Sequence, residues 1–203
     1  MCTYPHPNQS KEDNLNWAKS AIQGFCKLNG ITPPKIRTVS LYRGESNIFG
    51  SYTRGKDEIF VNLFRSRTPI KVPGFSWSYT GYKADLTTAG IAAHEFGHYL
   101  DYCLGYPSSS IKRMVKEEKN VSSYEPNASE TFAEMMKLFI LNPDLLRVGR
   151  PTRYRALTET LGFRPYITAS WEEVLGNAHP KLIAAAKTWI SQGAPKNNKV
   201  PIF

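Results

Sequence analysis

Two histidines and a glutamate lie within five residues in the segment AAHEFGHYLD, residues 92–101. His94 and His98 are four positions apart, so on an α-helix both imidazoles project from one face and can reach a single metal ion. Glu95 would stand beside that ion without ligating it, where a carboxylate can take a proton from a water molecule. This H-E-x-x-H spacing indicates metal-assisted hydrolysis. Because five residues can match by chance, the surrounding sequence has to supply the rest of the site.

A hydrolytic zinc site needs three protein ligands and one open position. In the longer pattern H-E-x-x-H-x-x-G-x-x-H the third ligand is a histidine, but here Asp101 occupies the glycine position and Leu104 the histidine position. The remaining histidines, His6 and His179, lie far away beside prolines, and isolated histidines are more often surface or packing residues. We therefore expect the third ligand to be a carboxylate.

Glu130 and Glu134 lie one turn apart in SETFAEMM, residues 129–136, on an otherwise apolar helix. An acidic pair on a face that packs inside the protein needs a charged partner, and a zinc ion would supply one. Glu130 also has a structural interpretation, because Asn127 three residues earlier resembles a capping box. The spacing alone leaves both roles open.

HEFGHYLD, followed by a tyrosine and then by ETFAE, resembles the zincin-fold gluzincin metalloproteases of the lethal-factor-like and Pro-Pro endopeptidase group. The resemblance covers about 50 residues, from position 92 to about 139. It implies a zinc-dependent endopeptidase in which His94, His98 and Glu130 bind Zn²⁺ and Glu95 is the general base. It also implies that Glu134 orients a ligand imidazole from behind.

The resemblance implies two further roles. Asp101 would steady the histidine helix, and a tyrosine ahead of the glutamate helix would stabilise the oxyanion of the tetrahedral intermediate. Tyr124 is the candidate, although it lies six residues before the glutamate where the family has seven. Tyr102 and Tyr106 are poorer alternatives.

Hydrophobic periodicity outlines the elements that must position these residues. Apolar spacing predicts helices over residues 11–29, ending at Gly30, and over 85–105, which contains the histidines. A third helix is expected over 127–146, and shorter ones over 156–161, 170–176 and 179–192. Residues 51–63 indicate a β-hairpin, and residues 65–84 indicate a long loop that either packs on the core or faces the substrate.

Together these elements predict an α+β, zincin-like fold. A small, mostly antiparallel sheet would pack against the H-E-x-x-H helix and the glutamate helix, and the strand at 58–63 would form the edge along which a peptide substrate adds. The length suits one domain over residues 1–203, with about 151–203 as a helical C-terminal extension.

Composition limits the class of protein and its partners. The N-terminus lacks a cationic start followed by an apolar run, and no segment reaches membrane-spanning length, so we expect a cytoplasmic protein, or a virion-associated one if a phage encodes it. Three cysteines without a C-x-x-C suit reduced thiols and make zinc ligation by sulfur unexpected.

The net charge of +9 points to an acidic partner besides the protein or peptide substrate. For the arginines near residues 147–164 a solvated helix face is favoured over a binding patch. Two alternative functions stay open: a zincin-fold structural or interaction protein of a phage or other assembly, and a nucleic-acid-associated protease, which is less favoured because that type uses a third histidine.

Overall fold

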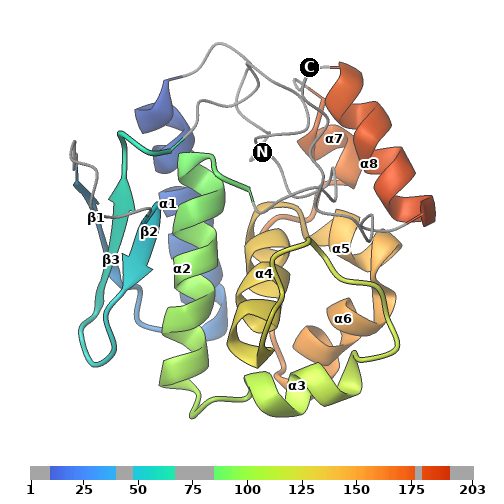
Figure 1. Ribbon diagram of the computed structural model, residues 1–203, viewed down its shortest axis with the longest axis horizontal. Coiled ribbons are helices and arrows are strands. Elements are labelled where there is room, and N and C mark those ends of the chain that lie inside the picture. The colour runs from blue at the N-terminus through green and yellow to red at the C-terminus, as the bar shows by residue number, and fades with distance from the viewer. Residues whose placement is uncertain (1–9, 40–47, 67–84, 177–179, 193–203) are drawn as a thin grey trace.

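The computed structural model describes residues 10–39, 48–66, 85–176 and 180–192, and Figure 1 shows their arrangement. Most of the long loop expected over 65–84 lies outside the described residues. His6 and His179 lie outside them as well. The described part is α+β, with helices and one small three-stranded sheet.

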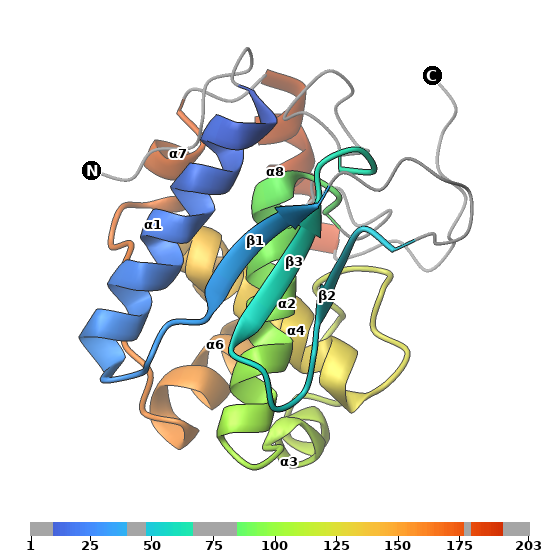
Figure 2. The same cartoon turned by 90° about the vertical axis from the view of Figure 1, so that its left-hand side faces the viewer.

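Helix α1, Lys11–Asn29, has the bounds that its sequence predicts. Ser10 and Asp13 form a reciprocal capping box at its start, and Gly30 closes its end in the left-handed region at φ 66°. Its apolar face, which includes Leu15, Ile22 and Phe25, is buried, and the helix packs along α2 (Figure 2).

The sheet contains β1 (Lys35–Val39), β2 (Gly50–Tyr52) and β3 (Glu58–Asn62) in the order β1-β3-β2. The predicted hairpin is confirmed, because β2 and β3 pair antiparallel. The expectation of a mostly antiparallel sheet is wrong, since β1 runs parallel to β3 over five residue pairs. A tight turn joins β2 to β3, whereas β1 and β2, although consecutive in the chain, lie on opposite sides of β3.

This order also corrects the expected substrate edge. β3, which contains most of segment 58–63, pairs on both sides and has no free edge, whereas β2 is an edge strand. The backbone N–H of Asn62 donates to Phe49 O at 2.8 Å, so by alternation the peptide groups of Gly50 and Tyr52 point away from β3. Ile59 and Val61 of β3 are buried, and the sheet packs on α2.

Helix α2, Thr88–Cys103, holds the H-E-x-x-H segment. Thr87 caps its start by accepting from the Gly90 N–H, and Gly105 follows its end at φ 72°. Helix α4, Ala128–Leu141, starts at the cap Asn127, whose side chain accepts from the Glu130 N–H. The helix expected over 127–146 is two helices, because Asn142 and Pro143 end α4 and begin α5, Pro143–Gly149.

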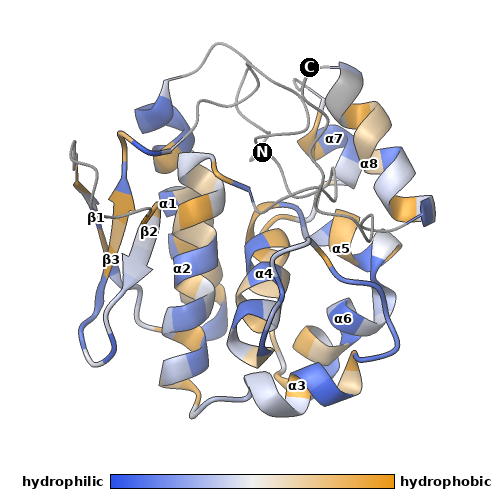
Figure 3. Ribbon diagram, in the orientation of Figure 1, coloured by the Kyte–Doolittle hydropathy of each residue, from blue (hydrophilic) through white to orange (hydrophobic). Residues whose placement is uncertain are grey.

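α2 and α4 cross in close contact at the centre of the molecule. A Cβ on Gly97 would lie 2.6 Å from the Cα of Ala133, so only glycine permits this approach. Hydrophobic residues run along both helices (Figure 3), and Phe96, Phe132 and Phe139 are buried in one core.

The remaining helices, most of them short, lie beyond α4 from the sheet or beneath α4 (Figure 1). They are α3 (Ser108–Met114), α6 (Pro151–Arg155), α7 (Trp171–Val174) and α8 (Pro180–Gln192), with a π-helical turn, η2 (Ala156–Thr160), after α6. No helix among the described residues is both long enough and apolar enough to cross a lipid bilayer.

The arginine-rich segment differs from the solvated face that its composition favours. Arg147 is exposed and pairs with Asp144, but Arg150 and Arg153 are each only 2% exposed. The prediction is therefore wrong for these two residues. Both turn inward: Arg150 stacks on the Trp189 ring, and Arg153 pairs with Glu125.

Candidate metal centre

Three side chains from α2 and α4 converge on one point. His94 Nε2 lies 3.1 Å from His98 Nε2 and 3.0 Å from Glu130 Oε2, and His98 Nε2 lies 3.5 Å from the same oxygen. Ligands held at about 2.0–2.1 Å by a tetrahedral ion are about 3.3–3.4 Å apart, so this triangle has the size of one tetrahedral face. The structure thus brings together the three residues predicted as ligands, and they could hold a metal ion.

The hydrogen bonds around His94 favour a cation at this point. Its Nδ1 lies 2.8 Å from Glu134 Oε1, so the ring donates there, and in the neutral ring Nε2 then presents a lone pair toward Glu130. Glu130 Oε2 is buried and faces the Nε2 atoms of both histidines. Lone pairs that face one another at this distance repel unless a metal ion or a proton lies between them. A metal ion satisfies all three atoms at once.

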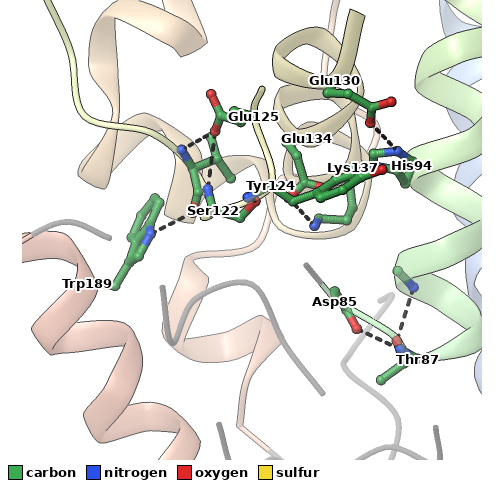
Figure 4. A network of polar contacts seen from close by, with 12 residues as sticks. Asp85, Thr87, His94, Ser122, Tyr124, Glu125, Glu130, Glu134, Lys137 and Trp189 are labelled. Carbon is green, nitrogen blue, oxygen red and sulfur yellow. Dashed lines mark hydrogen bonds and ion pairs between the residues drawn. The ribbon is translucent and has the colours of Figure 1, made fainter. Parts of the chain in front are cut away.

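Each histidine is oriented from behind by a residue of α4. Glu134 holds His94, as predicted, and Ser129 Oγ lies 3.0 Å from His98 Nδ1. Lys137 Nζ in turn binds Glu134 Oε2 at 2.5 Å, and both side chains are buried (Figure 4). Sequence reasoning missed Ser129 and Lys137. Lys137 could have been found, since it follows Glu134 by three residues on an apolar helix.

The pKa values in the metal-free site reflect this clustering. Burial lowers the pKa of His94, but Glu130 and Glu134 outweigh it and raise the value to about 9. Burial raises the pKa of Glu130, yet His94 and His98 bring it down to about 2. Glu134 also falls to about 2, because Lys137 and His94 outweigh its burial. The carboxylates are thus ionised and ready for a cation.

Glu95 lies beside the histidines on α2, at the position where this helix packs against strand β2. Its Cγ would be 3.1 Å from a Cβ on Gly50, and the backbone of Tyr52 hydrogen-bonds to its carboxylate. Burial raises the pKa of Glu95, opposed by His94 and His98. A carboxylate with a raised pKa is better suited to exchange protons near neutral pH. The Tyr52 contact was not predicted, because Tyr52 and Glu95 lie far apart in the sequence and meet only when β2 packs on α2.

Tyr124 lies at the site in spite of its shorter spacing from Glu130. Its ring centroid is 5.9 Å from that of His94, and its side chain is about half exposed. Burial, followed by the charges of Glu130 and Glu95, raises the pKa of the phenol, which keeps it protonated and able to donate. Tyr102 and Tyr106 instead meet edge to face, and the Tyr106 ring also faces Arg54.

Asp101 lies at the end of α2, where it receives a hydrogen bond from the Ser108 N–H at 3.0 Å. It thereby joins α2 to the start of α3. Its effect on the histidine helix is therefore exerted at the helix end.

A further buried carboxylate lies at the other end of α2. Asp85 Oδ1 accepts from the Thr87 N–H at 2.9 Å, and its carboxyl group packs on Gly90 (Figure 4). Burial raises its pKa to about 7, although the Lys137 charge opposes the shift. Asp85 therefore stabilises the start of the helix that presents the histidines.

Comparison with known proteins supplies no relative: no protein-family model matches the chain, and no curated protein or solved structure is significantly similar to it.

Proposed function

We propose that this protein is a zinc-dependent endopeptidase with a zincin-like fold. The observation that carries the proposal is the triangle of His94, His98 and Glu130, whose size suits a tetrahedral ion and in which a buried carboxylate oxygen faces both imidazole nitrogens. Two imidazoles and one carboxylate are a ligand set of catalytic zinc, which keeps its fourth position open. Glu95 beside them supplies the base that hydrolysis requires.

The chain's own residues then have distinct tasks. Zinc, when bound, supplies a Lewis acid that makes water more acidic and polarises a carbonyl group. Glu95 accepts the proton of the attacking water and returns it to the leaving amine. Tyr124 donates its phenolic hydrogen to the developing oxyanion. Glu134 keeps the His94 imidazole in one tautomer, with its lone pair toward the site.

The free edge of β2 is the proposed platform for the peptide. The peptide groups of Gly50 and Tyr52 point away from β3, and no strand among the described residues pairs with them. An extended substrate can add there as a strand, next to Glu95. The Tyr52 N–H already donates to Glu95, so the Gly50 N–H and the carbonyl oxygens of Gly50 and Tyr52 remain for the substrate.

Glu95→Gln tests the chemistry. We expect the variant to bind zinc normally and to cleave a peptide library about 10²–10⁴-fold more slowly, because it lacks the general base. Glu12→Gln, on the first turn of α1, is the matched control and should cleave at the wild-type rate. Cleavage by Glu95→Gln at the wild-type rate would refute the mechanism.

The ligand assignment is tested by metal analysis of two variants. Glu130→Ala should lose zinc, whereas Glu134→Ala should retain it with lower affinity, about 10–100-fold, because it only orients His94. The opposite pattern would exchange their roles. A wild-type protein that holds zinc but cleaves no peptide would favour the non-catalytic scaffold instead.

A further inference from the structure

The position of Tyr124 is determined by its backbone and not by its side chain. No hydrogen bond from its hydroxyl group is found within the described ranges, and 48% of the residue is exposed. Its N–H donates to Ser122 Oγ at 3.0 Å. A tyrosine that must meet an oxyanion within a few tenths of an ångström therefore depends on the rigidity of segment 121–125.

Glu125, the next residue, organises this segment. Its Oε1 accepts from the Val121 N–H at 2.5 Å and from the Ser122 N–H at 3.2 Å, which folds the backbone around the carboxylate (Figure 4). The carboxylate is almost fully buried. Segment 121–125 is thus wrapped around a negative charge that cannot be satisfied by water.

The partner of that charge comes from the C-terminal part of the chain. Arg153 of α6 donates to Glu125 Oε2 at 2.9 Å, and its side chain is only 2% exposed. Glu118, just ahead of the segment, accepts from the backbone N–H groups of Thr152 and Arg153 at 3.0 and 2.9 Å. Two carboxylates therefore tie one loop to the start of one short helix.

A second anchor comes from α8. Trp189 Nε1 donates to Val121 O at 2.9 Å, and the indole is 1% exposed (Figure 4). Arg150 stacks on the indole, with its guanidinium carbon 3.9 Å from the ring centroid, and donates to Asn120 O at 3.1 Å. Both ends of the segment are thereby held by helices that follow the metal ligands by 20 residues or more.

Buried ion pairs contribute little net stability, because the desolvation of both charges offsets their attraction. Their geometric restraint is large, since any displacement leaves a charge unpaired. Glu125 and Arg153 thus define one backbone position for the residue beside them, and that residue is Tyr124.

We propose that Glu125, Arg153 and Trp189 form a clamp through which the C-terminal helices position Tyr124 for catalysis. They are positioning residues, and the inference rests on the proposed peptidase function. The segment expected only as a helical extension of the domain thereby acquires a role in the reaction.

Trp189→Phe is the mild test, because it removes the hydrogen bond to Val121 and keeps an aromatic ring for Arg150, although the ring is smaller. We expect kcat to fall about three- to tenfold, the factor that one hydrogen bond supplies, with KM and zinc content unchanged. Glu125→Gln should lower kcat further, since it also leaves Arg153 without a countercharge. Trp171→Phe, a buried tryptophan of α7, is the matched control for loss of packing.

The same substitutions made in a Tyr124→Phe protein show whether the effect passes through Tyr124. If it does, Trp189→Phe and Glu125→Gln lower kcat in the wild-type background and leave it unchanged in the Tyr124→Phe background. Equal losses in both backgrounds, or a loss no larger than that of Trp171→Phe, overturn the clamp.

Hydrogen exchange provides a readout that does not depend on cleavage. Trp189→Phe should speed the exchange of amides 121–124 in the zinc-loaded protein and leave those of α2 unchanged, and unchanged exchange at 121–124 overturns the clamp. Wild-type protein that cleaves no peptide counts against the proposed function. A cleaving wild type whose rate is unaffected by Tyr124→Phe overturns only the inference.

Discussion

Lys137 illustrates how a single residue can support a candidate metal centre without being one of its ligands. Its ammonium group is 2% exposed and lies 2.5 Å from a Glu134 carboxylate that is fully buried. The lysine holds Glu134 ionised, and Glu134 holds His94 in the tautomer whose lone pair faces Glu130. The charge on a third residue thus sets the orientation of a ligand.

Replacing Lys137 by methionine should destabilise the protein by about 3–5 kcal/mol, because it leaves the Glu134 charge buried with a weaker partner. Urea unfolding of the metal-free protein measures this loss. Lys116→Met is the control, since Lys116 and Glu117 are 71% and 88% exposed and their pair contributes within about 0.5 kcal/mol. Equal stability of the two variants would show that the buried pair has no structural importance.

The titration of the ligands predicts how pH affects the metal-free protein. His94 has its pKa raised from 6.5 to about 9, so its contribution to folding is complete below pH 6.5 and is lost as pH rises through 9. Glu130 and Glu134 have theirs lowered from 4.5 to about 2, so their contribution is present above pH 4.5 and is lost as pH falls through 2. These groups therefore favour a stability maximum between pH 4.5 and 6.5.

Zinc must displace the His94 proton, because only a neutral imidazole ligates a metal. Zinc affinity should consequently rise about tenfold per pH unit up to pH 9, with release of about one proton at pH 7. Calorimetry in buffers of different ionisation enthalpy counts that proton. A count of zero at pH 7 would contradict the raised pKa of His94.

At the scale of elements, the site depends on how closely α2 and α4 approach. The histidines lie on α2 and the third ligand on α4, and the two helices meet where Gly97 packs on the Ala133 backbone. Glycine costs a helix about 1 kcal/mol relative to alanine. The close contact with Ala133 accounts for a glycine at this position.

Gly97→Ala should therefore separate the helices instead of stabilising α2. We expect a loss of about 1–3 kcal/mol, measured by urea unfolding, together with weaker zinc binding, because the added methyl group would lie 2.6 Å from the Ala133 Cα.

Gly24→Ala on α1 is the control for that substitution. Its methyl group would meet only the outer end of the half-exposed Tyr166 ring, which can turn aside, so zinc affinity should be unchanged. Normal zinc binding by Gly97→Ala would mean that the helices tolerate a wider spacing.

At the scale of the whole molecule, a metal ion would join the N-terminal and central parts of the fold. α2 packs on α1 and the sheet, whereas α4 packs on α2, α3 and α5, so ligands from α2 and α4 connect the two sides of the core. Binding to the folded state alone stabilises it by mass action.

A chelator should accordingly lower the thermal midpoint of the wild-type protein. Zinc at about 100 times its dissociation constant contributes about 2.7 kcal/mol, which the chelator removes. Scanning calorimetry with and without chelator measures the shift. Glu130→Ala should show no response, and an equal shift in that variant would place the metal elsewhere.

Local patterns account for the parts of the structure that were predicted correctly. The caps at Ser10, Thr87 and Asn127 and the apolar periodicity define three helices by contacts within four residues. Asn127 does cap α4, but the Glu130 side chain turns to the histidines, so only half of the suggested capping box forms.

All but one of the errors concern contacts between distant residues. The parallel pairing of β1, the central place of β3 and the burial of Arg150 and Arg153 depend on partners far along the chain. Periodicity carries no information about such partners. The break at Asn142 and Pro143 was visible in the sequence, where a proline predicts a helix boundary.

The sequence by itself determined that His94 and His98 share one helix face, because their spacing of four residues is close to the repeat of the helix, and that Glu95 lies beside them. It also placed Glu130 and Glu134 one turn apart. Only the tertiary structure decided that Glu130 meets both histidines while Glu134 stands behind His94, since that depends on the approach of α4 at Gly97. It likewise decided that the C-terminal helices contact the segment that holds Tyr124, through Arg153 with Glu125 and Trp189 with Val121. Sequence spacing does not predict these contacts, because the partners are far apart along the chain.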